Sequence, residues 1–230
     1  MELLVLSGDE VRMALPMADA IAGMKRAFAQ LSAGRAEMPL RSRVDVSEQD
    51  GVVLVMPAFL AETADLAVKV VSVFPRNVSR SKPIIHALVV ALDADTGQPV
   101  ALLEGGTLTA IRTGAASGAA TDVLARPDAE VVAIIGSGVQ ARTQLEAVCA
   151  VRQVSEVRVF SLQRAHAEVF AEEMAGRNGV PTRILVMDDA NSAVSEADIV
   201  CAATTSSTPV FDGRFLKPGA HVNGVGSFSP

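Results

Sequence analysis

The run Val131–Ile135 and the glycine-rich stretch Gly136–Ala141 that follows it constrain the fold of this chain more than any other feature. Five consecutive apolar residues are typical of a strand buried on both faces in a parallel sheet. In the stretch GSGVQA, Gly136 permits a tight turn, Gly138 lets the backbone approach a pyrophosphate, and Ala141 keeps the following helix close to the strand. The free N–H groups at the start of that helix attract phosphate. The sequence therefore predicts a dinucleotide-binding turn, and a glycine turn without a ligand is the alternative.

The same part of the chain alternates between strand-like and helix-like segments. This alternation is typical of a parallel sheet with helices on its faces. We therefore expect an α/β fold with a Rossmann-type domain over residues 116–230. The expected strands are 131–135, 157–160, 182–186, 199–203 and 221–225, and the expected helices are 140–151, 165–177 and 191–195.

The first half of the chain has a different pattern, and we expect it to form an α+β domain over residues 1–115. Ser7 and Glu10 have the spacing of a capping box that opens a short helix. A second helix, with one apolar face, begins near Pro16. Short β-rich runs then predict an antiparallel or mixed sheet. The expected strands are 41–46, 52–57, 66–74, 87–92 and 100–103, with turns at 50–51 and 95–97 and a closely packed helix over 107–124.

Composition excludes several classes of protein. The chain has 20 basic and 26 acidic side chains and a formal charge of −6, whereas a general nucleic-acid binder is usually basic. No apolar run is long enough to span a membrane, and the N-terminal segment does not have the pattern of a secretion signal. Cys149 and Cys201 make neither a disulfide framework nor a zinc site, so we expect buried thiols. We expect a soluble, cytoplasmic protein that binds neither nucleic acid nor membrane.

The stretch Phe160–Arg164 bears on which nicotinamide dinucleotide is bound. An acidic residue about 20 positions after the glycines would hold the ribose 2′-hydroxyl of NAD, and this stretch contains no carboxylate. Ser161 and Arg164 suit a 2′-phosphate instead, which favours NADP and leaves NAD possible. An exposed Arg164 without a ligand is the alternative. Two loops after later strands, Thr204–Ser206 and Asn223–Gly226, are expected to close around the cofactor.

Several further stretches, spread along the whole chain, form a pattern. They are 38–41 (MPLR), 56–58 (MPA), 68–71 (VKVV), 106–115 (GTLTAIRTGA), 135–141 (IGSGVQA) and 217–226 (KPGAHVNGVG). In this order they resemble the ornithine cyclodeaminase/mu-crystallin family, and the stretch TAIRT is quite specific. The resemblance implies a substrate and dimerisation domain joined to a Rossmann domain. It also implies a homodimer that acts on amino acids, cyclic imines or keto acids with NAD(P).

The resemblance gives roles to three basic residues. It implies that Arg41 and Lys69 grip a substrate carboxylate and that Arg112 lies where substrate and cofactor meet. The local sequence favours such roles, because Lys69 lies in an apolar strand and Arg112 in an apolar helix, where an isolated charge is costly without an anion. A salt bridge to an internal carboxylate is the alternative. His86 is expected either to line the same pocket or to be a hydrogen-bonded core histidine.

Two departures from the family pattern bear on the reaction. Cyclodeaminases of the family carry an acid–base Asp where this chain has Phe228. Phenylalanine cannot transfer a proton, which disfavours ornithine cyclodeamination. The family also continues beyond the position that matches Pro230, so we expect the chain to be truncated there, with a further segment that would cover the sheet of the Rossmann domain.

We therefore expect an NADP-dependent reductase of small cyclic imino acids, such as 1-pyrroline-2-carboxylate or 1-piperideine-2-carboxylate. Arg41 and Lys69 would hold the carboxylate during hydride transfer, and Lys69 is the candidate proton donor. Two alternatives remain: an amino-acid-deaminating enzyme of the ornithine cyclodeaminase or alanine dehydrogenase type, and a non-catalytic NADP-linked binder like mu-crystallin. The predicted cofactor-binding residues are Arg112, Thr113, Gly136, Gly138, Val139, Gln140, Ser161, Arg164, Thr204, Asn223, Val225 and Gly226, and no metal ligand is predicted.

Overall fold

A computed structural model describes residues 2–226 of the chain, which divides into two compact units. The first unit comprises residues 1–16 and 23–109, and the second comprises residues 17–22 and 110–230. Helix α3 (Gly105–Leu124) crosses the division, which falls between residues 109 and 110 rather than after residue 115. The segment 17–22 joins the second unit because Ile21 packs against Gly118. Phe228 lies outside the described residues.

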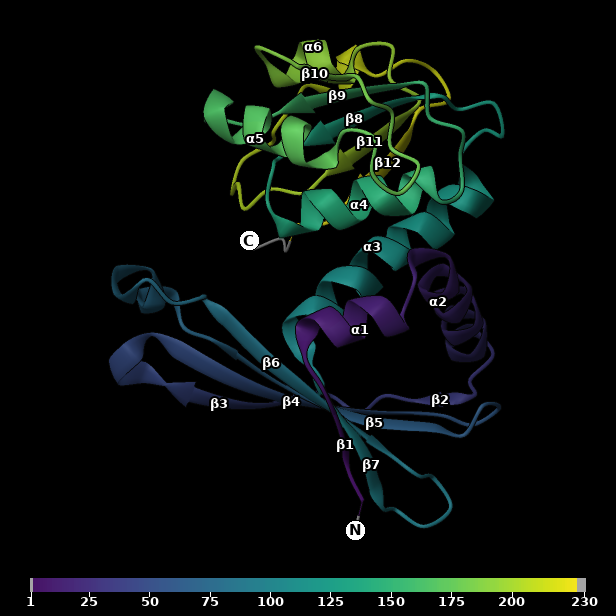
Figure 1. Cartoon of the computed structure of the whole chain (residues 1–230), viewed down its shortest axis with the longest axis vertical. Helices are drawn as coiled ribbons and strands as arrows, with labels where there is room; N and C mark the ends of the chain where they lie inside the picture. The colour runs from purple at the N-terminus through teal and green to yellow at the C-terminus, as the bar shows by residue number, and fades with distance from the viewer. Residues whose placement is uncertain (1, 227–230) are drawn as a thin grey trace. The chain divides into compact units, whose positions relative to one another are not determined.

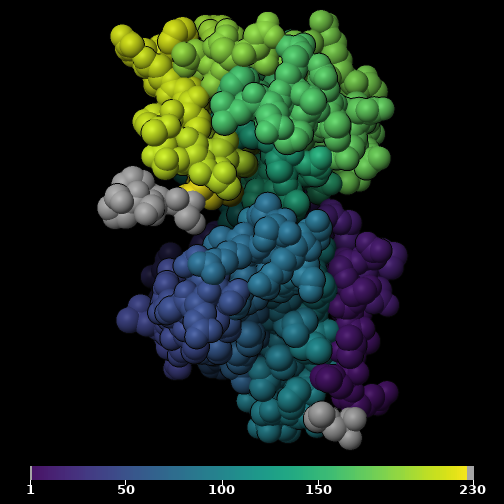
Figure 2. All heavy atoms as spheres, turned by 90° about the vertical axis from the view of Figure 1, so that its left-hand side faces the viewer, coloured from purple at the N-terminus to yellow at the C-terminus, as the bar shows by residue number. Residues whose placement is uncertain are grey.

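The first unit is built on a seven-stranded mixed sheet with the order β1-β7-β6-β5-β4-β2, in which β3 also pairs with β4. Strands β1 and β7 are parallel and the other pairs are antiparallel. In Figure 2 the purple N-terminal segment accordingly lies against the teal segment near residue 100. The strands are β1 (Leu4–Leu6), β2 (Ala36–Glu37), β3 (Ser42–Val46), β4 (Gly51–Leu60), β5 (Asp65–Val73), β6 (Ile85–Leu92) and β7 (Pro99–Glu104), and the helices are α1 (Gly8–Ala14) and α2 (Met17–Ser32).

The predicted mixed sheet is confirmed, and the structure differs from the prediction in local turns. Ser7 and Glu10 form both hydrogen bonds of the capping box. The turn before β4 begins earlier than expected, with a 3₁₀ turn η1 (Ser47–Gln49) and a left-handed Asp50 at φ +50°. Two further 3₁₀ turns, η2 (Pro75–Arg80) and η3 (Gly213–Phe215), were not expected either.

The second unit is the predicted Rossmann-type sheet, with five parallel strands in the order β10-β9-β8-β11-β12. Helices α4 (Val139–Cys149) and α5 (Arg164–Met174) pack on one face, and α6 (Ala190–Val194) packs on the other (Figure 1). The strand order reverses between β8 and β11, which is where ligands bind in such sheets. The strands are β8 (Val131–Ile135), β9 (Glu156–Phe160), β10 (Ile184–Val186), β11 (Ile199–Ala202) and β12 (His221–Gly224).

Within this unit the Ala- and Gly-rich part of α3 packs closely on α4, as its composition predicted. A Cβ atom on Gly114 would lie 2.4 Å from the carbonyl oxygen of Thr143, so only glycine permits this approach. Cys149 is partly buried and Cys201 fully buried, and burial raises the pKa of both thiols to about 12. Both are therefore unreactive thiols at neutral pH. None of the described helices is long and apolar enough to cross a membrane.

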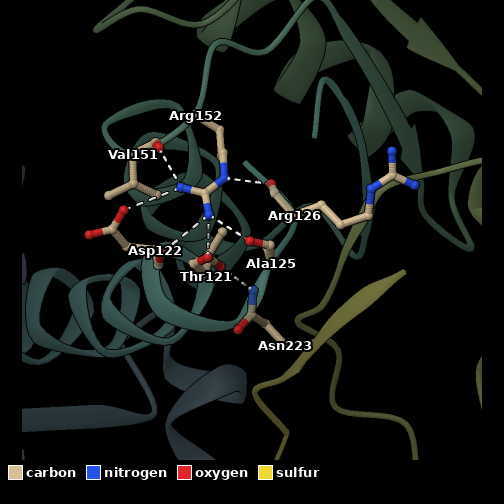
Figure 3. Close-up of polar contacts among 7 residues, drawn as sticks. All are labelled: Thr121, Asp122, Ala125, Arg126, Val151, Arg152 and Asn223. Atoms are coloured by element: carbon tan, nitrogen blue, oxygen red, sulfur yellow. Dashed lines mark hydrogen bonds and ion pairs between the residues drawn. The ribbon is translucent and has the colours of Figure 1, made fainter. Parts of the chain in front are cut away.

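Arg152 anchors the C-terminal end of α3 (Figure 3). Its side chain is only 7% exposed. Its guanidinium donates hydrogen bonds to the carbonyl oxygens of Thr121 (2.9 Å), Asp122 (3.2 Å), Ala125 (2.8 Å) and Arg126 (3.0 Å). A cation at this position also complements the negative end of the helix dipole. These bonds hold the C-terminal turn of α3 against the segment that follows α4.

A buried ion pair between Asp198 and Lys217 makes a pH-dependent contribution to stability. The Asp198 carboxylate is 8% exposed and lies 2.5 Å from Lys217 Nζ, and it accepts the N–H groups of Glu130 and Val131 at 3.0 and 2.9 Å. Burial alone would raise the pKa of Asp198, but the hydrogen bonds from Lys217 and from the two amides outweigh it and lower the pKa. Because the folded pKa is depressed, this stabilisation is present above the unfolded pKa of about 4 and is lost as pH falls through the folded pKa.

We expect Asp198→Asn to lower the free energy of unfolding at neutral pH by about 3 kcal/mol and to flatten its dependence on pH in the acid range. Asp45→Asn is the control, because Asp45 pairs with Arg43 at the surface, where both side chains are more than half exposed. Urea unfolding at a series of pH values measures both effects. Equal stabilities of wild type and Asp198→Asn at neutral pH would contradict the prediction.

Candidate functional site

The turn between β8 and α4 requires glycine at position 136. Gly136 has a φ of +104°, and a Cβ atom there would lie 2.4 Å from the carbonyl oxygen of Ala203. Its N–H donates to the carbonyl oxygen of Phe160 at 2.8 Å. The turn is therefore seated between the ends of the two strands that neighbour β8.

Gly138 leaves the N-terminus of α4 open. It is the N-cap residue, at φ −79° and ψ −171°, and no side chain caps the helix. No heavy atom lies within 4 Å of the position that a Cβ atom would take. The first N–H groups of a helix have no partner within the helix, and here no side chain caps them. This combination fits a diphosphate group, whose negative charge the helix N-terminus favours.

A cavity of about 1330 Å³ adjoins this turn, at the carboxyl ends of β8, β9, β10 and β11. Its volume exceeds the ~300–1,000 Å³ typical of small-molecule sites, which leaves room for a dinucleotide. Ser137 and Ser161, from the ends of two neighbouring strands, are hydrogen-bonded at 3.0 Å between their hydroxyl oxygens. The lining residues are Ile135–Gly138, Phe160–Leu162, Asp189–Asn191 and Ala203–Gly213.

Arg142, at the end of the first turn of α4, holds the glycine turn in place. Its Nη1 donates to the carbonyl oxygens of Ser137 (2.6 Å) and Gly138 (3.1 Å). Glu173 accepts hydrogen bonds from Nε and Nη2 of the same guanidinium, which also lies 5.5 Å from the ring centre of Phe170. With these carbonyl groups turned towards Arg142, the glycine turn is fixed before any ligand binds. The sequence analysis missed Arg142; its signal is a basic residue one helical turn after the second glycine.

The predicted cofactor residues fall into two groups in the structure. Gly136, Gly138, Ser161 and Thr204 line the cavity. Gly226 lies near one of them, because a Cβ atom on it would be 3.2 Å from the carbonyl oxygen of Thr204. The structure does not place the following predicted residues in the cavity lining: Arg112, Thr113, Val139, Gln140, Arg164, Asn223, Val225 and Gly226.

Arg164 and Asn223 are engaged in contacts that the sequence could not reveal. Arg164 donates to Glu168 at 2.9 Å and to Asp188 at 2.5 Å. Asn223 is 7% exposed, and its side-chain amide donates to the hydroxyl of Thr121 at 2.9 Å (Figure 3). The side chain of Asn223 therefore ties β12 to α3 inside the second unit, instead of presenting its amide to the cavity.

Two of the predicted substrate-binding residues, Lys69 and Arg41, belong to the first unit. Lys69 lies half-buried on β5, with Nζ 2.8 Å from the hydroxyl of Thr109 on α3. Arg41 precedes β3, is exposed and forms no ion pair with any residue of the part that the structure describes. His86 is also exposed, so it is not the core histidine that was one of the two expectations.

Arg112 lies on α3, one turn after Thr109. Within residues 2–226 its side chain makes no hydrogen bond or ion pair, so the alternative interpretation, a salt bridge to an internal carboxylate, does not hold for Arg112 there. Solvent reaches the side chain, yet partial desolvation lowers the pKa of its guanidinium. Arginine stays protonated at neutral pH despite such a shift. Arg112 is therefore a cation that is available to an anionic ligand. The carbonyl oxygen of its neighbour Thr113 accepts a hydrogen bond from the side-chain amide of Gln144 at 3.3 Å.

Two further residues of the cavity lining, Leu162 and Asp189, were not predicted as site residues from the sequence. Asp189 caps α6 by accepting the N–H of Ser192 at 2.8 Å, and hydrogen bonds from the side chain and backbone of Ser192 lower the pKa of Asp189. Leu162 is 94% exposed although it is apolar. Leu162 and Asp189 lie in the segments after β9 and β10, and position after a strand end is the one sequence signal that could have indicated them.

Comparison with known proteins is consistent with this geometry. A model of the ornithine cyclodeaminase/mu-crystallin family matches residues 1–230. A Δ1-pyrroline-2-carboxylate reductase of Bacillus cereus is 40% identical over 228 residues, which are 99% of this chain and 69% of that protein. The structure of Thermococcus litoralis Δ1-pyrroline-2-carboxylate reductase with NADH and L-proline superposes with a TM-score of 0.89 at 42% identity, over 97% of this chain and 68% of that one. An archaeal alanine dehydrogenase dimer with bound NAD gives a TM-score of 0.87 at 30% identity, over 96% and 67%.

Proposed function

Since this chain belongs to the ornithine cyclodeaminase/mu-crystallin family, we propose that it is a nicotinamide-dependent oxidoreductase that reduces a small cyclic imino acid. The substrate class is that of 1-pyrroline-2-carboxylate and 1-piperideine-2-carboxylate. One observation carries the proposal: an open helix N-terminus beside a dinucleotide-sized cavity occurs in a chain that is 40% identical to a Δ1-pyrroline-2-carboxylate reductase along 99% of its length.

When bound, the nicotinamide would supply the hydride for the imine carbon. The residues of the chain would bind the cofactor and the substrate, orient the imine and supply its proton. The N–H groups at the start of α4 would hold the diphosphate, and Arg41 and Lys69 would hold the substrate carboxylate by charge-assisted hydrogen bonds. Arg112 would add a third positive charge next to the reacting groups. A carboxylate fixed in this way orients the imine carbon for attack.

The proton for the imine nitrogen would come from the ammonium group of Lys69. Its Nζ already donates one hydrogen bond, to the hydroxyl of Thr109, and an ammonium group carries three protons. The bond to Thr109 would hold the Lys69 ammonium group beside α3 while it gives a proton to the substrate.

An assay with cyclic imino acids tests the proposal directly. The purified protein is mixed with NADH or NADPH and either imine, and the loss of absorbance of the reduced nicotinamide is followed. We expect imine-dependent oxidation of the cofactor and formation of the saturated cyclic amino acid. Conversion of ornithine to proline with only catalytic NAD would instead identify a cyclodeaminase. Oxidative deamination of alanine in preference to imine reduction would identify an alanine dehydrogenase. Cofactor binding without any turnover would identify a binding protein.

The proposed enzyme is a homodimer that buries one face of the sheet of the first unit. Cross-strand pairing places Val44, Val70, Leu88 and Val5 on the same face, and they are 59%, 39%, 48% and 61% exposed. Val71 and Ala87 on the other face are each 8% exposed. A broad apolar face of this kind marks an interaction surface, and the similar alanine dehydrogenase is a dimer.

We expect Leu88→Lys to convert a dimer into a monomer, because the substitution places a charge at the centre of the apolar face. Val169→Lys is the matched control, since Val169 on α5 is also 48% exposed but lies in the other unit. Light scattering coupled to size exclusion should give twice the chain mass for wild type and Val169→Lys, and the chain mass for Leu88→Lys. A monomeric wild type would refute the proposed dimer.

A further inference from the structure

We infer that the cavity of the second unit selects NADH over NADPH and that Leu162 is the residue that determines this choice. The inference rests on the proposed function, because it concerns the cofactor of the same site. It differs from the expectation drawn from Ser161 and Arg164, which favoured NADP.

The end of β9 is the part of the cavity wall expected to contact the 2′-position of the adenosine ribose. In Rossmann-type domains the residues that follow the second strand of the motif contact this group. Here that strand is β9, and Phe160, Ser161 and Leu162 at its end all line the cavity. The side chain of Leu162 is 94% exposed, so it projects from the wall without packing against the described protein.

The charge of the cavity wall does not suit a 2′-phosphate. A 2′-phosphate carries about −1.5 to −2 charges at neutral pH, and its recognition requires a cation or several N–H donors. The described residues that line the cavity include no Lys, Arg or His, but they include Asp189 and Asp212. Asp212 is neutralised by Arg214, at 2.5 Å. Asp189 accepts hydrogen bonds from the N–H and hydroxyl of Ser192 and from the N–H of Asn191, and it pairs with no cation among the described residues. The wall is therefore neutral to negative, which disfavours an additional phosphate.

Arg164, two residues after Leu162, is already paired with carboxylates. Both of its carboxylate partners are in place, Glu168 on the same helix and Asp188 after β10. A 2′-phosphate would have to compete with these two carboxylates for the guanidinium, and Arg164 does not line the cavity. A ribose hydroxyl, by contrast, needs only neutral partners such as Ser161, whose hydroxyl is hydrogen-bonded to that of Ser137 at 3.0 Å.

Leu162 is thus the position at which a cation would change the choice of cofactor. Arginine at this position would place a guanidinium beside Ser161 on the cavity wall. Since Leu162 is almost fully exposed, the substitution removes no packing and should not affect folding.

The test is a titration of the protein with NADH and with NADPH, followed by the fluorescence of the reduced nicotinamide, for wild type, Leu162→Arg and Arg164→Gln. We expect wild type to bind NADH at least about tenfold more tightly, and Leu162→Arg to shift the ratio of the two Kd values towards NADPH by about 10- to 100-fold. Leu162→Gln, which is polar but uncharged, is the matched control and should shift the ratio much less. Arg164→Gln tests the rival assignment and should leave the ratio within about threefold of wild type.

Three results would overturn the inference. Equal or tighter binding of NADPH by wild type would contradict the selectivity itself. A selective loss of NADPH binding in Arg164→Gln would assign the 2′-phosphate to Arg164, and an unchanged ratio in Leu162→Arg would remove Leu162 from the site. In each of these cases the proposed reductase function stands, whereas binding of neither nucleotide would overturn that function and this inference with it.

Discussion

Gly138→Asp is expected to leave the melting temperature of the protein unchanged or slightly raised while weakening the binding of NADH by about 100-fold or more. Aspartate is a favoured N-cap residue, the backbone at φ −79° accommodates any L-residue, and no atom lies within 4 Å of the new Cβ position. The same side chain would occupy the space beside the N–H groups of α4 and would repel a diphosphate. Thermal unfolding and a NADH titration of the same samples measure the two effects.

Two further substitutions make this result specific. Gly138→Asn has nearly the same shape and no charge, so it should weaken binding less than aspartate and separates the steric part of the effect from the electrostatic part. Gly136→Ala should lower both stability and binding, because its φ of +104° and the 2.4 Å approach to the carbonyl oxygen of Ala203 exclude a Cβ atom. A Gly138→Asp protein that binds NADH like wild type would show that the diphosphate is not held at this helix N-terminus.

Lys69→Met is expected to reduce kcat/KM for a cyclic imino acid by about 100-fold or more, since it removes a charge-assisted hydrogen bond and the proposed proton donor together. Methionine keeps the length and the apolar stem of lysine, so the packing of β5 should change little. The Kd for NADH should stay near the wild-type value, because the described residues that line the cavity all belong to the second unit. Steady-state kinetics and a NADH titration together test this.

Lys82→Met is the matched control, because Lys82 is an exposed lysine of the same unit and its loss removes the same charge. It should leave kcat/KM unchanged. Lys69→Arg separates the two roles of Lys69: it should retain part of the substrate affinity, seen in KM, but lose kcat, because guanidinium is a poor proton donor at neutral pH. If Lys69→Met reduced substrate at the wild-type rate, Lys69 would have neither role.

Most helices and strands of the fold were predictable from sequence because they depend on local patterns. Val131–Ile135 is apolar at every position, and the structure buries four of its five residues almost completely. The capping box of α1 was equally readable, since it needs only Ser7 and Glu10 at the right spacing. Strand β1 was not predictable, because a three-residue parallel edge strand such as Leu4–Leu6 depends on its partner β7 and not on its own periodicity.

In the candidate site, too, features that depend on one short segment were predictable, and contacts between residues far apart in the sequence were not. The glycine turn was predictable because the turn, the helix start and the close packing of Ala141 all lie within one short segment. The interaction of Arg164 with Asp188 was not, because its partner is 24 residues away in the sequence. The anchoring of Asn223 on Thr121 spans 102 residues. Such contacts decide which predicted residues remain available to bind a cofactor. For this reason residue type alone could not decide between NAD and NADP.

The central claim is that backbone N–H groups at the start of α4 bind the cofactor diphosphate. Amide hydrogen exchange of the wild-type protein, resolved by residue and compared with and without saturating NADH, tests it most directly. The account predicts that the strongest new protection falls on the amides of residues 137–140. Saturation with NADH that leaves these amides exchanging as in the free protein, with protection elsewhere, would contradict it.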